Sequence, residues 1–494
     1  TQNTGLGVGA ATANTTGNYN TSVGYLALGA NTTASNNTAI GHQSLLTNTT
    51  GASNSALGFS SLEANTTGGA NTALGYQALH SNTTASNNTG VGTNALEANT
   101  TGTNNTAVGQ GALASNTTAS ANTAVGNNSQ TSNTTGEGNV SMGYRSLDSN
   151  TTGIHNTAIG SYSLDTNTTG QLNTAVGYEA LEANNASSNQ AFGRRALYVN
   201  TTGTENNAFG YLALDSNTTG SYNVAMGVNA LGSNTTASTN TAVGHAAMLA
   251  NTTGENNAAF GYEALDANTT GQSNTALGRN ALSDQTTADN NTGVGYDAGG
   301  HNVAVGYDSL DGLTTGYSNV CIGASTTPNG SGSIGAIVIG KSLTAPGDNS
   351  FAFGQTAQGR VYNSYGANAS WTRDSDERLK QDIQNSTLGL DFINDLRTVT
   401  FRWKPNNELP ETFDAYQKDN IKDTSTVMHG MIAQEVKAAL DTAGVSTFGG
   451  WTESASDGCQ SISQELFVHP LIKAVQELSA KVTAAEARIT TLEG

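Results

Sequence analysis

The stretch NTSVGYLALGANTTASN at residues 20–36 decides the fold, because close copies of it follow one another along most of the chain. The glycine after its aliphatic residue returns every 17 residues from Gly7 to Gly177. One residue is then lost before Gly193, and the interval is again 17 up to Gly295, which makes eighteen units. A fixed period of this length predicts a stack of coils, a solenoid, instead of an ordinary globular domain.

Within one unit, the β-branched and aromatic residues around Val23 favour a short strand. Side chains alternate between the two faces of a strand, so Val23 points to one face and Ser22 to the other. The pair Ala27–Leu28 follows at an odd offset, so a bend must lie between it and Val23 if all three are to face one core. Residues 31–33 supply turn chemistry. We therefore expect two short strands and two turns in each coil.

Asparagine occupies one place in sixteen successive units, from Asn14 to Asn268, and Gln285 takes that place in the next unit. Stacked coils lie roughly 4.7 Å apart, so these side chains are expected to form an amide ladder from coil to coil. Only 36% of the residues are apolar. We expect such a polar shaft to need partner chains to complete its core.

The chain changes character towards its C-terminus. Residues 301–374 keep only part of the repeat, with an 11-residue step to Gly306 and a 14-residue step to Gly354. Residues 375–494 hold 11 Lys/Arg and 18 Asp/Glu, against 7 and 19 in residues 1–374. The expected organisation is a regular shaft at 1–300, an irregular neck at 301–374 and a compact domain at 375–494.

A formal net charge of −19 argues against nucleic acid and anionic membranes as partners, because both select for basic patches. No apolar run approaches the length of a membrane span. No two histidines or cysteines have the spacing of metal ligands, so we expect no metal and no cofactor. Cys321 fills a small-residue position of the repeat and Cys459 lies in a polar loop, which suggests a buried small residue and an incidental thiol.

The repeat resembles the left-handed parallel β-roll of trimeric autotransporter adhesin heads. Its core motif Asn-x-Ala-[Val/Ile]-Gly occurs, for example, at residues 37–41 and 156–160. The period here is longer than in that family, and the Asn-Thr-Thr-Gly segment accounts for the extra residues. The resemblance implies three rolls packed about an axis.

Other uses of the repeat have simpler explanations. Asn-Thr-Thr fits the glycosylation pattern, but turn-forming asparagine explains it without glycans. Thr32 and Thr33 are adjacent and cannot both line one flat ice-binding face. One position carries a row of tyrosines suited to sugar binding or to packing between coils. Another carries acidic residues that we expect to be solvated and unpaired, which argues against a glycan-cleaving site. The tyrosines are Tyr25, Tyr76, Tyr178, Tyr211 and Tyr262, and the acids are Glu63, Glu97, Asp148, Asp165, Glu182, Asp215 and Asp266.

The segment at residues 371–380 is the one whose residues suggest chemistry. If residues 378–380 open a helix, Lys380 can fold back toward the hydroxyl of Ser375. A desolvated lysine amine is a workable base for a serine nucleophile. Ser375 can also cap that helix, and the two roles are compatible.

Three sequence blocks and a final helix resemble the intramolecular chaperone domain of endosialidases and phage tail fibres. The blocks are SDERLK at 375–380, LRTVTFRWK at 396–404 and HGMIAQEV at 429–436, with Met431 where phenylalanine is common. The resemblance implies a domain that brings three chains of a β-fibre into register and then cuts itself off. It implies cleavage between Asp374 and Ser375, with Ser375 as nucleophile and Lys380 as base, and a released fragment of about 13 kDa.

The last segment, 466–494, has apolar residues at alternating steps of three and four: Leu471, Val475, Leu478, Val482, Ala485, Ile489 and Leu492. This heptad pattern predicts a three-stranded coiled coil. Nearly identical units allow whole-coil slips between chains at little cost, so three chains need such a seed to align.

We therefore predict a mainly β, homotrimeric fibre: a parallel β-roll solenoid of 17-residue repeats, then a small α/β chaperone that ends in a coiled coil. Such a fibre is made in the host cytoplasm and acts outside the cell in the virion tail of a bacteriophage. Its expected partners are other tail proteins and a receptor or glycan on the host surface. Its expected catalysis is at most one self-cleavage. A bacterial surface adhesin and an ice- or glycan-binding solenoid remain open as alternatives.

Overall fold

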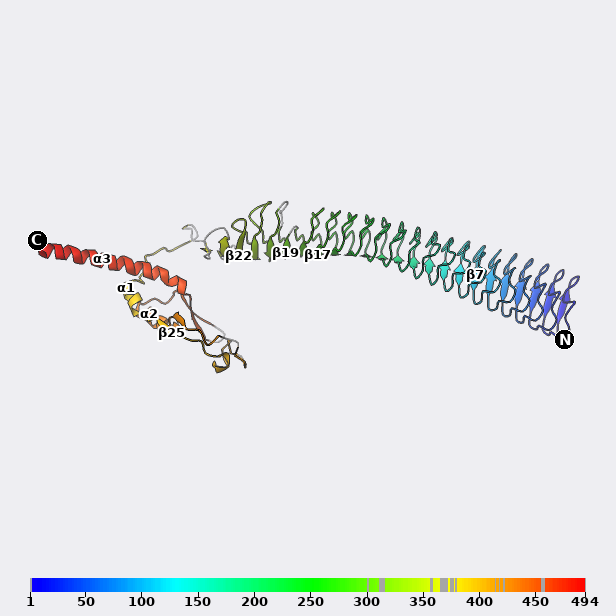
Figure 1. The fold of residues 1–494 in the computed structure, drawn as a ribbon, viewed down its shortest axis with the longest axis horizontal. Helices are drawn as coiled ribbons and strands as arrows, with labels where there is room; N and C mark the ends of the chain where they lie inside the picture. Colours follow the sequence, from blue (N-terminus) through cyan, green and yellow to red (C-terminus); the bar gives the residue numbers. More distant parts are fainter. Residues whose placement is uncertain are drawn as a thin grey trace. The chain divides into compact units, whose positions relative to one another are not determined.

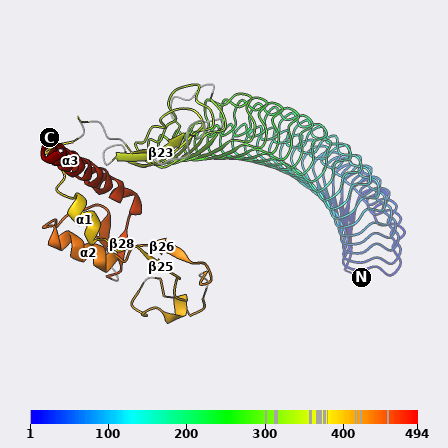
Figure 2. The same cartoon turned by 60° about the vertical axis from the view of Figure 1, so that its left-hand side comes forward.

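The computed structural model describes residues 2–299, 302–310, 316–355, 359–364, 372–373, 377, 380–413, 415–416, 418–420, 423–454 and 458–493. The chain divides into two compact units, Thr1–Asp374 and Ser375–Gly494. Figures 1 and 2 show the first unit as successive coils that begin at the N-terminus. In its described residues, the second unit combines helices with short strands.

Each coil of the shaft contributes one short strand that pairs in parallel with the strands of the coils before and after it. The register follows the repeat, so that Val23 lies beside Ile40. The parallel strands are β1 (Thr4–Leu6), β2 (Thr21–Val23), β3 (Thr38–Ile40), β4 (Ser55–Leu57), β5 (Thr72–Leu74), β6 (Thr89–Val91), β7 (Thr106–Val108), β8 (Thr123–Val125), β9 (Val140–Met142), β10 (Thr157–Ile159), β11 (Thr174–Val176), β12 (Gln190–Phe192), β13 (Asn207–Phe209), β14 (Val224–Met226), β15 (Thr241–Val243), β16 (Ala258–Phe260), β17 (Thr275–Leu277), β18 (Thr292–Val294), β19 (Val303–Val305), β20 (Val320–Ile322), β21 (Ile337–Lys341) and β22 (Ser350–Gln355). The predicted parallel β-solenoid is confirmed.

The predicted second strand of each coil is wrong. Leu26 and Leu28 have φ values of 56° and 54°, in the left-handed region that strands avoid. Hydrogen bonds between coils hold them there: Leu26 N–H donates to Val8 O of the preceding coil, and Leu28 N–H to Ser44 O of the following one. The side-chain pattern indicates which residues are buried but not the sign of φ, so this turn was not predictable from it.

The core of the shaft is narrow, and we placed the wrong strand residue in it. Ser22, Ala27 and Leu28 are fully buried, whereas Val23 is only half-buried. A Cβ built on Gly90, which takes the Ser22 position in its coil, would lie 3.3 Å from the side chain of Leu79. The leucine of the turn thus fills the interior and leaves room only for a small residue on the strand. The aliphatic residue therefore points outward.

The apolar core is interrupted where polar residues replace the Ala–Leu pair. One cluster ends at Ala124 and the next begins at Leu147. Between them Ser129 and Gln130 replace the Ala–Leu pair, and Ser129 Oγ donates to Ser141 Oγ at 2.7 Å. Burying these hydroxyl and amide groups is tolerated because they bond to one another.

The repeated glycine of the motif is required by both conformation and space. Gly126 has a φ of 142°, and a Cβ there would lie 2.3 Å from the carbonyl oxygen of Gly143 in the next coil. The same close approach recurs along the row, as at Gly24 and Gly227. Only glycine allows the backbones of successive coils to meet in this way.

The predicted amide ladder is present. Asn31 Nδ2 donates to Asn14 Oδ1 at 2.9 Å, and Asn48 Nδ2 donates to Asn31 Oδ1 at 3.0 Å. The other amide hydrogen of Asn31 goes to the carbonyl oxygen of Ala34, 3.1 Å away. Each asparagine therefore joins two coils and closes its own turn.

The ladder is interrupted where the repeat is irregular. Asn167, directly before the 16-residue coil, and Asn268, directly before Gln285, each bury an Oδ1 that has no hydrogen-bond partner among the described residues. A missing residue at the first of these places and a change from asparagine to glutamine at the second thus each leave an unsatisfied acceptor inside the shaft.

A second asparagine row, which sequence analysis missed, lies at the start of each strand. The backbone N–H of Asn37 donates to Asn20 Oδ1 at 2.9 Å, and Asn20 Nδ2 donates to Ala34 O at 2.9 Å. The signal was visible, because asparagine holds this place in every unit from Asn3 to Asn319. We interpreted it only as part of the strand motif.

In the 16-residue coil a side chain supplies a hydrogen-bond acceptor that the backbone supplies elsewhere. In a regular coil, the backbone N–H groups of Thr32 and Thr33 both donate to Thr49 O. In the coil before the deletion, Thr168 and Thr169 N–H instead donate to Asn185 Oδ1, both at 3.0 Å. The amide of Asn185 thus replaces a missing peptide carbonyl.

The parallel stack continues past residue 300. Cys321 in β20 is fully buried and lies between Ala304 and Val338 of the adjacent strands. After β22 the direction reverses, because β23 (Gly359–Ser364) pairs antiparallel with β22, and β24 (Thr372–Arg373) pairs antiparallel with β23.

The second unit packs short elements around one apolar cluster of Leu388, Phe392, Val436, Ala439, Leu440 and Phe467. Its elements are α1 (Leu390–Asp395), β25 (Val399–Phe401), the 3-10 helix η3 (Asn406–Glu408), β26 (Met428–Gly430), α2 (Ala433–Thr442), β27 (Trp451–Glu453), β28 (Gln460–Ile462), the 3-10 helix η4 (Gln464–Phe467) and α3 (Val468–Glu493). The predicted terminal helix is α3.

Candidate functional site

The predicted cleavage motif is only partly described. Asp374, Ser375 and the two residues before Lys380 lie outside the described residues, so the separation of the serine and the lysine stays untested. Lys380 is exposed, and its backbone N–H donates to Glu377 O at 3.0 Å, which forms a tight turn. Residues 381–389 are not helical. The predicted helix therefore does not extend beyond Lys380.

The second and third sequence blocks are joined directly in the structure. Strand β25 pairs antiparallel with β26, and Thr400 lies opposite His429. Arg397, beside β25, binds Glu435 in α2 through two hydrogen bonds, one of them 3.0 Å long from Nε to Oε2. These hydrogen bonds to Arg397 lower the pKa of Glu435. Residues far apart in sequence thus form one surface.

Helix α3 is joined to α1 by a hydrogen bond that one of its carboxylates accepts. Glu477 Oε2 accepts a hydrogen bond from the backbone N–H of Leu390, at the start of α1, at 2.8 Å. A Cβ on Gly389 would lie 2.3 Å from that oxygen, so glycine is needed for the approach. The bond from Leu390 lowers the pKa of Glu477, and Lys473 on the same helix adds to this effect.

A groove of about 630 Å³ lies beside β25 and β26 and includes His429, Gly430 and Gln464 in its walls. A neighbouring groove is lined by Ile393, Leu396, Phe467 and Leu471. Thr398, Met431 and Gln464 line both. Met431, the residue that departs from the expected phenylalanine, therefore lies on an open apolar surface.

The apolar seam of α3 is uncovered in the single chain. Leu471, Val475, Leu478, Val482, Ile489 and Leu492 are all exposed, Leu492 by 84%. These are positions of the predicted heptad. A helix with its apolar face in water is unfavourable unless another chain covers that face.

Three of the shaft's acidic residues correct our expectation of a solvated, unpaired row. Asp165 is only 5% exposed, and Arg145 contacts both Asp165 (Nη2 to Oδ2, 3.3 Å) and Asp148 (Nε to Oδ2, 3.1 Å). Burial raises the pKa of Asp165 to about 6, and Arg145 opposes the shift. Arg195 likewise contacts Asp215 at 3.3 Å. Ion pairs between coils explain these residues better than acid–base catalysis does.

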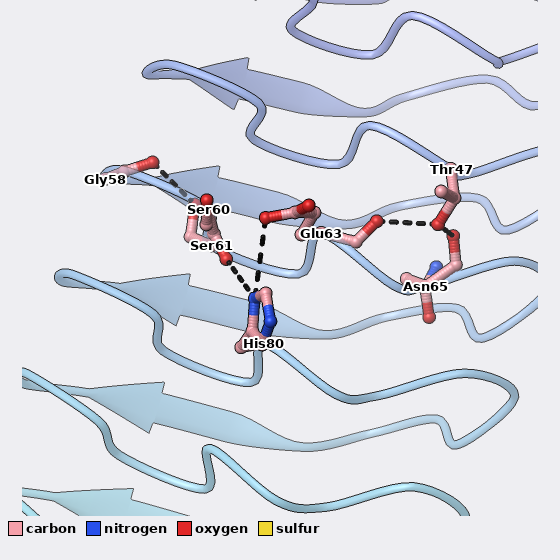
Figure 3. A network of polar contacts seen from close by, with 7 residues as sticks. All are labelled: Thr47, Gly58, Ser60, Ser61, Glu63, Asn65 and His80. Carbon is pink, nitrogen blue, oxygen red and sulfur yellow. Dashed lines mark hydrogen bonds and ion pairs between the residues drawn. The ribbon is translucent and has the colours of Figure 1, made fainter.

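A related contact links neighbouring coils through a histidine (Figure 3). His80 Nδ1 lies 3.6 Å from Glu63 Oε2 and 3.3 Å from Ser60 O. In the same network, Thr47 Oγ1 donates to Glu63 O at 2.6 Å. The acidic position of the repeat therefore serves coil-to-coil contacts here as well.

The aromatic row packs against itself. The rings of Tyr25, His42, Phe59 and Tyr76 stack in succession with centroids 5.0–5.4 Å apart. Further along, Arg194 lies over the rings of both Tyr178 and Tyr211. Stacked rings cover the faces that a sugar would use, which favours packing between coils over sugar binding.

The threonines of the turn are similarly engaged. Thr32 Oγ1 donates to Thr49 O at 3.1 Å, and the equivalent bond recurs at Thr49, Thr66 and Thr83. A hydroxyl held by the next coil is a poor ligand for ordered water.

Burial raises the pKa of the Cys321 thiol to about 12, which makes it unreactive.

Within the described part of the chain, no three His, Cys, Asp or Glu side chains are grouped so as to hold a metal ion. Nor does any helix there combine the length and hydrophobicity of a membrane span.

Residues 375–445 match the family model described as chaperone of endosialidase. The match begins at Ser375, the first residue of the second compact unit. No curated protein and no solved structure matches the chain. The matched region and the solenoid shaft together fit a tail fibre that carries a C-terminal chaperone.

Proposed function

We propose that the chain is one of three identical subunits of a bacteriophage tail fibre, and that residues 375–494 align the three chains. The observation that carries this proposal is the family match at 375–445 followed by a helix whose apolar seam faces water. Three α3 helices packed through that seam would bury it. A chaperone at the end of a repetitive shaft would also prevent the three chains from pairing out of register.

The same unit is proposed to release itself once. Ser375 Oγ would attack the carbonyl carbon of Asp374, with its proton passing to the Lys380 amine and on to the Ser375 nitrogen as the peptide bond breaks. Water would then hydrolyse the resulting ester, giving a carboxylate on Asp374 and regenerating the serine hydroxyl. Support comes from the family match, which begins at the residue after the scissile bond.

Cleavage is expected to follow assembly. A lysine acts as a base only in its neutral form, which burial favours. Lys380 is exposed in the single chain. A neighbouring subunit that covered it would supply the burial, so that self-cleavage reports a completed trimer.

Denaturing electrophoresis and intact mass spectrometry of the full-length protein test the cleavage. The wild-type chain should give a C-terminal fragment of about 13 kDa, and Ser375→Ala and Lys380→Ala should not. Ser386→Ala, a nearby exposed serine, is the control and should cleave as the wild type does. Equal bands for wild type and Ser375→Ala would refute the assignment.

Light scattering of Ser375→Ala tests the subunit number without interference from cleavage. The expected mass is about 151 kDa, three times the chain mass of 50.3 kDa. A mass of one chain would overturn the fibre proposal. Attachment to a host receptor or glycan, contacts with other tail proteins and an extracellular place in the virion belong to the same proposal.

The alternatives have less support. A bacterial adhesin filament would share the shaft but gives no reason for the chaperone match. The stacked aromatic rings and the bonded threonine hydroxyls disfavour a glycan- or ice-binding solenoid.

A further inference from the structure

One outward-facing position of the shaft is apolar in every parallel strand from β1 to β22. Its residues are Leu6, Val23, Ile40, Leu57, Leu74, Val91, Val108, Val125, Met142, Ile159, Val176, Phe192, Phe209, Met226, Val243, Phe260, Leu277, Val294, Val305, Ile322, Ile339 and Phe353. Many are more than a third exposed, among them Leu57 at 44% and Leu277 at 49%. We call this set the outer aliphatic row.

The outer aliphatic row is not explained by the fold of a single chain. The core is already filled by the turn leucine and the small strand residue. The residue two positions before the row residue in each strand shares the outward face and is also uncharged, from Thr4 in β1 to Phe351 in β22. A continuous apolar band on the order of 1,000 Å² exceeds the few hundred Å² that soluble monomers commonly expose.

We propose that three copies of this chain meet along the outer aliphatic row, parallel and level with one another, so that the row lines the common axis. The inference rests on the trimer proposed above and adds which face of the shaft forms it. The repeat itself indicates which molecule covers the row. Only a partner with apolar residues at the same coil spacing matches such a row along its length, and a second copy in the same direction has them.

The row also carries information about register. The row carries the smaller side chain valine at Val91, Val108 and Val125. At Phe192 and Phe209 it carries large rings, whose centroids lie 4.7 Å apart in a stack. A slip by one coil would place Phe192 of one chain beside Val176 of another. Mismatched volumes in a packed layer are destabilising. The units are thus less interchangeable between chains than their common motif suggests, and the shaft itself helps to select the alignment.

Disulfide trapping in the full-length protein tests the face. In a Cys459→Ser background, Val108→Cys brings three thiols to the axis, and oxidation should link about two thirds of the chains as dimers on non-reducing gels, because three thiols allow one disulfide. Thr118→Cys, exposed on the turn of the same coil, is the matched control and should link few chains. Val243→Cys repeats the test in a distant coil.

Register is tested by coexpressing two differently tagged chains, one with Val108→Cys and one with Met142→Cys. Level chains should give 108–108 and 142–142 pairs but no 108–142 pair, because these positions are two coils apart. A trimeric mass without linkage at either Val108→Cys or Val243→Cys overturns the proposed face and leaves the trimer standing. A trimer with abundant 108–142 pairs overturns the level alignment, and a monomeric mass overturns the trimer itself.

Discussion

In the shaft a buried amide finds its partner one coil away, whereas in the C-terminal unit a polar group finds its partner at one distant residue. Asn31 bonds to Asn14, and the same bond recurs in later coils. Glu477 bonds to Leu390, 87 positions away, and nothing repeats that contact. The shaft therefore depends on contacts that recur from coil to coil, and the C-terminal unit depends on a few unique contacts. Changes to a repeated position should be costly, and changes to a unique one more modest.

The largest effect is expected at the glycine row. Gly126→Ala would force a Cβ to within 2.3 Å of Gly143 O at a φ of 142°, so we expect the free energy of unfolding of the shaft to fall by about 3–5 kcal/mol. Far-UV circular dichroism during denaturant unfolding measures this change.

The matched control is Gly5→Ala. Gly5 lies in the strand position that alanine fills in later coils, at Ala39 and Ala56, and a Cβ there would come no closer than 3.4 Å to a neighbouring atom. We expect the free energy of unfolding to fall by less than about 1 kcal/mol in this variant. Similar losses at both glycines would contradict the importance of the close backbone contact.

The next effect compares an intact rung of the ladder with a broken one. Asn116→Ala removes the hydrogen bonds to Asn99 and Ala119, and it takes away the acceptor that Asn133 Nδ2 uses. We therefore expect the free energy of unfolding to fall by about 2–4 kcal/mol. Asn167→Ala should cost less, because the Oδ1 of Asn167 has no partner to lose. Denaturant unfolding of the two variants side by side measures the difference. Equal losses would mean that the hydrogen bond accepted from the asparagine of the next coil contributes nothing to stability.

The sequence predicted the solenoid and one ladder because both follow from period and residue type. It did not predict that Val23 points outward. Strand alternation defines two faces without saying which is inside, and the left-handed turn at Leu28 decides that question. The ion pair of Arg145 with Asp165 joins residues 20 positions apart, one coil plus three, so neither coil reveals it alone. Ser375 lies outside the described residues, and its role stays a prediction.

The smallest effect is expected in the C-terminal unit, at Glu477. The bond from Leu390 lowers the pKa of this carboxyl below its ordinary value of 4.5. A carboxyl with a lowered folded-state pKa stabilises the fold above its unfolded-state pKa, and this contribution is lost as pH falls through the folded-state pKa. The thermal midpoint of the wild-type C-terminal unit should therefore fall more steeply below about pH 5 than that of Glu477→Gln.

Tryptophan fluorescence in a Trp371→Phe background isolates this signal from the first unit, because the two remaining tryptophans, Trp403 and Trp451, lie in the C-terminal unit. Glu486→Gln, exposed on the same helix, is the control and should follow the wild type. Parallel pH profiles for Glu477→Gln and the wild type would show that the contact with α1 does not hold α3 in place. The stability of the C-terminal unit would then depend on many contacts together, as the stability of the shaft does.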